Sequence, residues 1–237
     1  MASTHKTPLV MVPGLLCTAN LYADQVSGLA DIADMTIGRH TGHPTMAAIA
    51  EEILGSAPQR FALAGLSMGG YIALEILRRA PDRVMRLALL DTSARPDLPE
   101  RTAARRKLIE LGRTHGMAAV QTALLPSLVL VARQDEQPLA GRIVQMAVDT
   151  GFDAFVRQQE ALMSRPDSRG FLETIQCPTL VVVGDADALT PPEMAHELNA
   201  GIAGSKLVVV PACGHLSTME RPEAVNSALR QWLTASG

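Results

Sequence analysis

Ser67 lies in the stretch Gly65-Leu66-Ser67-Met68-Gly69-Gly70, between a short apolar run and a segment with helical spacing. Residues 60–64 predict a buried strand, and the apolar positions within 71–80 predict a helix. A serine at such a corner is presented on a sharp turn, with glycines where a Cβ would clash with neighbouring backbone. A plain glycine-rich turn is the alternative. The context favours a nucleophilic serine, with the amide of Met68 placed to donate to a developing oxyanion.

A serine hydroxyl is a weak nucleophile at neutral pH and needs a neighbouring base. Of six histidines, His215 directly follows the carboxyl end of an aliphatic strand, at the same sheet edge as Ser67, and is the expected base. His40 and His43 also follow a strand and could face the pocket, but histidines in a Gly/Pro loop are more often solvated. The other three histidines are weaker candidates for the base. His115 lies in a predicted insertion, His5 at the N-terminus and His196 on a polar helix face.

Three aspartates are candidates to orient the base. Asp185 and Asp187 lie in the loop after the penultimate predicted strand. Asp91 ends the strand that follows the helix predicted at 71–80. The chain order serine, acid, histidine is expected when each residue lies beyond a successive strand. Asp185 could instead bond local amides, as turn aspartates often do, and Asp91 could cap the chain as it leaves its strand.

Predicted strands and helices alternate along the chain. The strands are 8–12, 34–39, 60–64, 83–90, 179–183 and 206–210, and the helices are 20–29, 46–54, 71–80, 193–200 and 222–233. Continuous aliphatic strands separated by helices indicate a mostly parallel sheet covered on both faces. The predicted fold class is therefore α/β.

Residues 95–176 interrupt this alternation with four helix-like segments, 98–112, 117–130, 139–148 and 152–163. We expect a core formed by 1–94 and 177–237, with 95–176 as a helical lid over the carboxyl ends of the strands. Asp97 is the expected N-cap of the first of these helices, with a proline just inside it.

Two groups of side chains in the insertion have alternative interpretations. A basic run could attract anionic substrates, although a solvated helix face is the more frequent role of such a run; it comprises Arg101, Arg105, Arg106 and Lys107. Met117, Met146 and Met163 could line a pocket, but core filling is the more common role of methionine.

Composition agrees with one domain that carries an insertion. The 237 residues are 47% hydrophobic and 19% charged, with a net charge of −3. The sequence has no stripe of basic residues, which argues against a nucleic-acid partner. No apolar run reaches the ~18 residues needed to span a membrane, and the N-terminal residues lack the order of a signal peptide, so we expect a cytoplasmic protein. Cys17, Cys177 and Cys213 form no CxxC pair, which argues against disulfides and zinc.

The sequence resembles the α/β-hydrolase superfamily, in particular its small lidded esterases and enol-lactonases, over nearly the whole chain. The resemblance rests on the serine stretch, on 178–187, on Gly214-His215 and on Pro13-Gly14-Leu15. It implies a six-stranded sheet, because the family's first two strands have no counterpart here. It also implies Asp187 as the catalytic acid beside Ser67 and His215, and the Leu15 amide as a second oxyanion donor.

Two departures from the family pattern affect the walls of the pocket. Pro13 replaces the usual histidine of the oxyanion turn, and 39–43 matches the common Asp-x-Arg-Gly-x-Gly loop only loosely. Ser67 also argues against haloalkane dehalogenases and epoxide hydrolases, which use aspartate at that position.

The resemblance implies a serine hydrolase that cleaves a small carboxylic ester or lactone through an acyl-serine, without metal or cofactor. Carbon–carbon bond hydrolysis of a β-diketone-like compound is an alternative, because the same three residues serve it. A low-turnover ligand-binding protein on the same fold is another. The oligomeric state is not predicted.

Overall fold

The computed structural model describes residues 6–235 and contains one six-stranded sheet in the order β2-β1-β3-β4-β5-β6. Every adjacent pair is parallel, which confirms the predicted α/β class. The strands are β1 (Thr7–Val12), β2 (Ala33–Ile37), β3 (Phe61–Leu66), β4 (Val84–Leu90), β5 (Thr179–Gly184) and β6 (Lys206–Val210). All six lie within two residues of their predicted bounds. The positions 1–5, with His5, lie outside the described residues.

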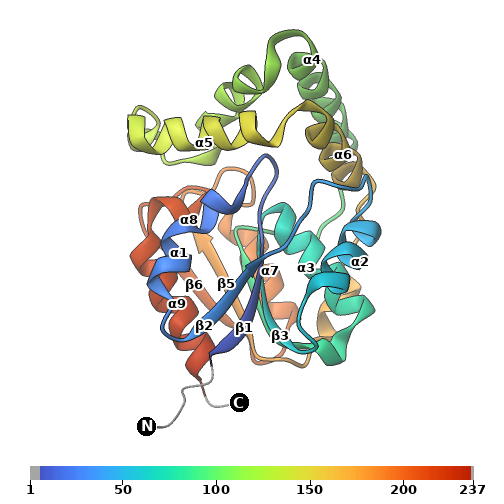
Figure 1. The fold of residues 1–237 in the computed structure, drawn as a ribbon, viewed down its shortest axis with the longest axis vertical. Coiled ribbons are helices and arrows are strands. Elements are labelled where there is room, and N and C mark those ends of the chain that lie inside the picture. Colours follow the sequence, from blue (N-terminus) through green and yellow to red (C-terminus); the bar gives the residue numbers. More distant parts are fainter. Residues whose placement is uncertain (1–5, 236–237) are drawn as a thin grey trace.

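Helices cover both faces of this sheet (Figure 1). Successive side chains of a strand point to opposite faces, so Leu9 and Met11 pack into one core cluster and Val10 and Val12 into another. The first cluster lies under α1 (Ala23–Gly28) and α9 (Pro222–Thr234). The second is covered by α2 (Met46–Ser56), α3 (Met68–Arg79) and α7 (Pro192–Gly201).

Two of these helices begin in contrasting ways. Thr45 caps α2, because its hydroxyl accepts a hydrogen bond of 3.2 Å from the Ala48 amide. Helix α3 begins directly after Ser67 with no side-chain cap. Among the described residues, no acceptor takes a hydrogen bond from the amides of Met68 and Gly69, so these two can serve a ligand at the carboxyl edge of the sheet.

Three helices form an insertion between β4 and β5: α4 (Pro99–Leu128), α5 (Gln137–Thr150) and α6 (Phe152–Met163). They lie above the carboxyl ends of the strands (Figure 1). Gly116, with φ of 80°, breaks α4 into two parts, so all four predicted helical segments are present. The short elements of the fold are the 3-10 turns η1 (Ala19–Tyr22), η2 (Pro81–Arg83), η3 (Val131–Arg133) and η4 (Arg169–Thr174), and helix α8 (Ser217–Glu220).

Asp97 does not cap α4 as predicted. The N-cap position is Leu98, and no side chain caps it. The carboxylate of Asp97 is instead buried, accepting hydrogen bonds from Arg105, Arg165 and the Thr102 hydroxyl. Two arginines outcompete the helix amides for this acid, since charge-assisted hydrogen bonds are the stronger ones.

Two of the three methionines of the insertion fill the core, while the third, Met163, is half-buried. Met117 packs with Val120 and Phe155 beneath α4, and Met146 joins the larger cluster on the α9 side. Neither Met117 nor Met146 is among the residues that line the cavity beside Ser67, so core filling is their role.

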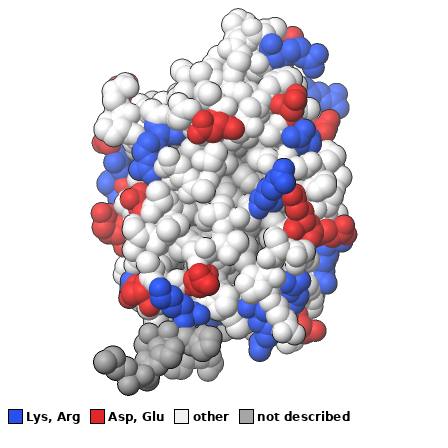
Figure 2. All heavy atoms as spheres, in the orientation of Figure 1, with Lys and Arg blue, Asp and Glu red and all other residues white. Residues whose placement is uncertain are grey.

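Charges of both signs are interspersed on the face shown in Figure 2, with no continuous basic stripe. Within the described residues, no helix is long and apolar enough to cross a membrane.

Candidate active site

Ser67 occupies the turn between β3 and α3 in a strained conformation, with φ of 55°. A Cβ on Gly65 would overlap the Gly69 carbonyl oxygen, and a Cβ on Gly69 would overlap the carbonyl oxygen of Val12. The predicted requirement for glycine at both positions is therefore confirmed. The close approach brings the serine turn against the end of β1.

Hydrogen bonds hold the backbone of Ser67 in this conformation. Its amide donates to the Leu90 carbonyl oxygen at 2.9 Å, and its carbonyl oxygen accepts from the Thr92 hydroxyl at 2.8 Å. No hydrogen bond to another described residue engages the hydroxyl, and Ser67 lines the main cavity.

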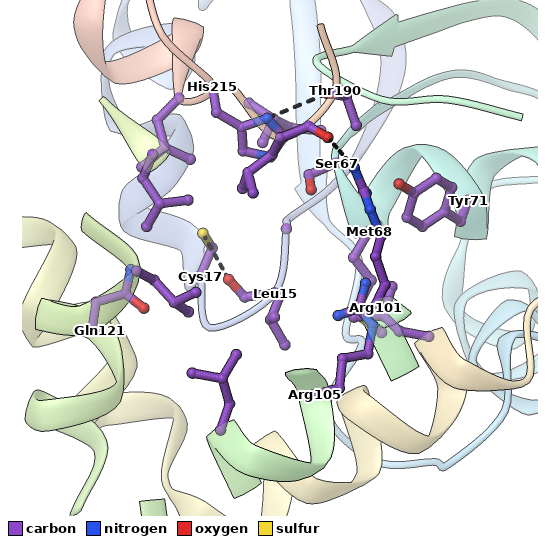
Figure 3. A pocket seen from close by; sticks show the side chains of 18 of the residues that line it. Leu15, Cys17, Ser67, Met68, Tyr71, Arg101, Arg105, Gln121, Thr190 and His215 are labelled. Carbon is purple, nitrogen blue, oxygen red and sulfur yellow. Dashed lines mark hydrogen bonds between the residues drawn. The ribbon is translucent and has the colours of Figure 1, made fainter. Parts of the chain in front are cut away.

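His215 and Asp187 form a buried pair, with exposed fractions of 2% and 3%. Nδ1 of His215 lies 2.8 Å from Oδ2 and 3.0 Å from Oδ1 of Asp187. A ring nitrogen facing a carboxylate carries the proton. The Nε2 atom on the opposite edge of the neutral ring is therefore free to accept one, and His215 lines the same cavity as Ser67 (Figure 3).

Thr190 holds the Asp187 carboxylate in place. The amide of Thr190 donates to Oδ1 at 2.9 Å and its hydroxyl to Oδ2 at 2.8 Å, while the Leu189 amide adds a third bond of 2.8 Å. Burial favours a raised pKa for Asp187, but His215 and these donors hold the pKa below its ordinary value. Burial likewise favours a lowered pKa for His215, but the facing Asp187 carboxylate outweighs it and raises the pKa.

The other two candidate aspartates contact the loops around the pair. Asp185 accepts a 3.0 Å hydrogen bond from the Cys213 amide. It thereby joins the loop after β5 that carries Asp187 (the acid loop) to the loop after β6 that carries His215 (the histidine loop). Asp91 accepts from the Gly184 amide at 3.0 Å and pairs with the Ser217 hydroxyl, rather than capping the following residues. Burial and nearby Asp187 raise the pKa of Asp91 to about 8. Of the three, Asp187 is the one that reaches His215.

The cavity has a volume of about 250 Å³ and lies between the sheet edge and the insertion. Aliphatic side chains from both parts make up most of its wall, among them Leu66, Leu108, Leu124, Leu128 and Leu162. Arg101 and Arg105 also line it (Figure 3), while Arg106 and Lys107 are exposed. The basic run is thus divided between the cavity and solvent. Burial raises the pKa of Cys17, another lining residue, to about 12, so its thiol is no rival nucleophile.

Leu15 and Met68 border the cavity beside Ser67. Among residues 6–235, no acceptor takes a hydrogen bond from the amide of either residue. Both amides are therefore available to an oxygen atom in the cavity.

His40 supports this loop, contrary to the expected solvated turn residue. It is only 3% exposed, and its Nε2 lies 2.9 Å from the Gly14 carbonyl oxygen. A carbonyl accepts but cannot donate, so Nε2 carries the proton. Burial lowers the pKa of His40 to about 4, which keeps the ring neutral. His40 thus fixes the peptide group whose N–H belongs to Leu15. His43 is half exposed, 3.5 Å from Glu52.

Two further residues hold the site together and carried no signal in the sequence pattern. The Tyr22 hydroxyl donates to the Val12 carbonyl oxygen at 2.8 Å and accepts from the Leu66 amide at 3.1 Å, bridging the ends of β1 and β3. Glu220 accepts from the Gly214 amide through one oxygen and from the Leu130 amide through the other, each at 2.8 Å. Glu220 thereby joins the histidine loop to the insertion.

Residues 6–235 contain no group of three His, Cys, Asp or Glu side chains arranged to hold a metal ion.

The parallel sheet, the strained serine turn and the histidine–aspartate pair beyond later strands define an α/β hydrolase. The sequence profile of the alpha/beta hydrolase family matches residues 10–228, so the chain belongs to that family.

Similar proteins include esterases and a lactonase. The pimeloyl-[acyl-carrier protein] methyl ester esterase of Neisseria meningitidis is 31% identical over 175 residues, covering 71% of this chain and 55% of that protein. An esterase from Thermogutta terrifontis superposes with a TM-score of 0.87 at 32% identity, over 96% of this chain and 89% of the other. The enol-lactonase of Burkholderia xenovorans LB400 superposes with a TM-score of 0.88 at 27% identity, over 99% of this chain and 94% of the other. These findings agree with the predicted ester or lactone hydrolase class.

Neutral, buried His40 predicts a specific pH dependence of stability. The unfolded chain protonates this histidine below about pH 6.5, whereas the folded protein resists protonation down to about pH 4. Stability is therefore fully present above pH 6.5 and falls as the pH drops toward 4, by about 3 kcal/mol. His40→Gln retains an amide donor but cannot titrate. Urea unfolding across this range should show a steeper loss in the wild type than in the variant. His43→Gln is the matched control, and parallel curves for wild type and His40→Gln would contradict the assignment.

Proposed function

We propose that the Ser67 hydroxyl attacks the carbonyl carbon of a carboxylic ester or lactone to form an acyl-serine, which water then hydrolyses. The observation that carries this proposal is that Ser67, on its strained turn, and the His215–Asp187 pair open into one cavity. Similarity to esterases and to an enol-lactonase supports the same class of substrate.

The first step needs a base and a fixed tautomer. Because Nδ1 of His215 donates to Asp187, Nε2 takes the serine proton as the carbon–oxygen bond forms. The ring becomes cationic, and the adjacent Asp187 carboxylate stabilises that charge. The same Nε2–H then protonates the leaving alkoxide.

The negative charge on the carbonyl oxygen is held by the amides of Leu15 and Met68. One such donor typically contributes ~3–4 kcal/mol to the transition state. His40, donating to the carbonyl oxygen of Gly14, polarises and orients the peptide that carries the Leu15 amide. His40 acts as a positioning residue that substitutes for the support expected from the histidine that Pro13 replaces.

In the second step His215 takes a proton from water, and the resulting hydroxide attacks the acyl-serine. The Leu15 and Met68 amides hold the oxyanion again. Collapse of this intermediate returns the proton to Ser67 and releases the carboxylic acid.

The proposal extends to the surroundings of the site. Residues 95–176 act as a lid, since α4 supplies one wall of the cavity. The partner is a small-molecule ester or lactone that fits about 250 Å³. A cytoplasmic location is supported by three cysteines that are all free thiols.

Replacement of the nucleophile should abolish turnover. A fluorophosphonate should label Ser67 in the wild type, and Ser67→Ala should lose 10⁴–10⁶ in kcat, on the order seen for serine-protease triads. Mass spectrometry locates the label, and p-nitrophenyl esters, lactones and a β-diketone give the rates. Label on another residue, or near-normal activity of a folded Ser67→Ala, would rule the proposal out. Preferential cleavage of the β-diketone would favour carbon–carbon hydrolysis instead.

The raised pKa of His215 predicts the acid limb of the pH–rate profile. The base must be neutral to accept a proton, so kcat/KM should rise with pH through a midpoint above the ordinary histidine value of ~6.5. Burial and Arg101 lower this pKa, but the facing Asp187 carboxylate outweighs them. In Asp187→Asn the midpoint should move below the wild-type value. A flat wild-type profile from pH 5 to 8 would contradict His215 as the base.

Substitution of the three aspartates separates their roles. Asp187→Asn should cost ~10²–10⁴ in kcat with the fold unchanged, because the wrong imidazole tautomer is then favoured. Asp91→Asn should retain most activity at pH 7, because the pKa of about 8 means that Asp91 is already largely protonated there, and asparagine resembles the neutral acid.

Asp185→Asn is the matched control in the same loop and should change kcat little. Melting temperatures of all three variants show whether each remains folded. A folded Asp91→Asn that loses activity while Asp187→Asn keeps it would reverse the assignment.

A further inference from the structure

The permanent charges in the wall of the cavity are all positive. Its wall is mainly aliphatic, and the permanently charged side chains among its described lining residues are Arg101 and Arg105. Within residues 6–235, no aspartate or glutamate lines it. Such a pocket favours a ligand with an apolar body and a negative group.

Arg101 has no carboxylate partner within 4 Å in the described part of the chain. Its Nη2 donates to the Leu189 carbonyl oxygen at 2.9 Å, which anchors the guanidinium beside the acid loop. Arg101 also lowers the pKa of His215, so its positive charge acts at the catalytic end of the cavity. Figure 3 shows its side chain extending from α4 toward that end.

Arg105, one helical turn further along α4, belongs to a cluster that is itself positive. Asp97 is shared between Arg105, at 3.1 Å, and Arg165, at 2.8 Å, and all three side chains are largely buried. Two guanidinium groups and one carboxylate leave one positive charge uncompensated. Since a buried charge is costly without a partner, this cluster also favours an anion in the cavity that Arg105 lines.

A third polar group lies on another part of the wall. Gln121 lines the cavity and is 1% exposed, and its Oε1 has no hydrogen-bond partner within residues 6–235. A buried acceptor without a donor is unusual in a pocket meant for a purely aliphatic ligand, and this oxygen suits a hydrogen-bond donor of the ligand rather than its anionic group. The cavity therefore contains polar contacts that no group of the protein uses.

We propose that the substrate is an anionic ester or lactone with a carboxylate a few bonds from the scissile carbonyl, and that Arg101, assisted by the charge of the Arg105 cluster, binds that carboxylate. This inference rests on the proposed serine hydrolase function. It makes Arg101 the residue that determines specificity for charge, while Ser67 and His215 carry out the chemistry.

The test compares two matched series of substrates. Monomethyl esters of C4 to C8 dicarboxylic acids carry the carboxylate, and methyl esters of monocarboxylic acids of equal chain length lack it. Methanol release gives kcat/KM for each. The wild type should prefer the anionic member at least ~10-fold at the best chain length, as expected for a charged pair in a partly desolvated site. Added salt should reduce this preference.

Variants of one helix isolate the contribution of Arg101. Arg101→Gln should reduce the ratio of anionic to neutral kcat/KM at least ~10-fold. Arg106→Gln removes the same charge from an exposed position of α4 and should leave the ratio unchanged. A wild-type preference for neutral esters, an equal loss in both series with Arg101→Gln, or the same ratio change with Arg106→Gln would overturn the inference.

Binding without turnover separates this inference from the proposed function. Glutarate or adipate should bind the Ser67→Ala variant in calorimetry, and the additional change Arg101→Gln should weaken that binding at least ~10-fold. If Ser67 is labelled and neutral esters are cleaved but the dicarboxylate does not bind, the charge specificity is wrong and the hydrolase assignment stands. If the dicarboxylate binds through Arg101 but Ser67 is neither labelled nor needed for turnover, the hydrolase assignment fails and an anion-binding pocket remains.

Discussion

At the carboxyl edge of the sheet, segments of backbone pass each other with no space for a side chain between them. Gly69 packs against the Val12 carbonyl at the end of β1, and Gly184 packs against the carbonyls of Cys213 and Gly214. The first approach places the serine turn beside the loop that carries the Leu15 amide. The second places the Asp187 loop beside the His215 loop. The geometry of the whole site depends on these two approaches, because any Cβ there would separate the residues that must meet.

The same edge contains the backbone strain of the molecule. The described residues include four non-glycine residues with positive φ, namely Leu16, Ser67, Asp91 and Ala212. Each follows the end of a strand, β1, β3, β4 or β6. Conformations of this kind cost roughly 1–3 kcal/mol each and persist where surrounding structure over-determines them. Here the hydrogen bonds of Gln158, Thr92, Asp91 and Asp185 provide that support.

The sequence was informative where function depends on local chemistry. A serine between glycines predicts its own turn, and aliphatic runs predict the strands within two residues. It was less informative where a residue's role depends on a distant partner. Asp97 looks like a cap until Arg165, 68 positions later, is seen to share its carboxylate. His40 looks solvated until its bond to Gly14, 26 positions earlier, is seen. Likewise, which arginines of α4 face the cavity depends on how the helix is rotated on the core, and no pattern within the helix specifies that.

The hydrogen bonds of Glu220 matter when the helical cap of one α/β hydrolase is exchanged for that of another. Its two oxygens join the amide of Gly214, next to His215, to that of Leu130, where the chain leaves α4. A cap transplanted from another hydrolase therefore needs a backbone N–H at the position of Leu130. A proline there would leave one oxygen of a buried carboxylate unsatisfied and loosen the histidine loop. For recombination of caps and cores, the junction near Leu130 therefore has to be kept together with the histidine loop that Glu220 joins to it.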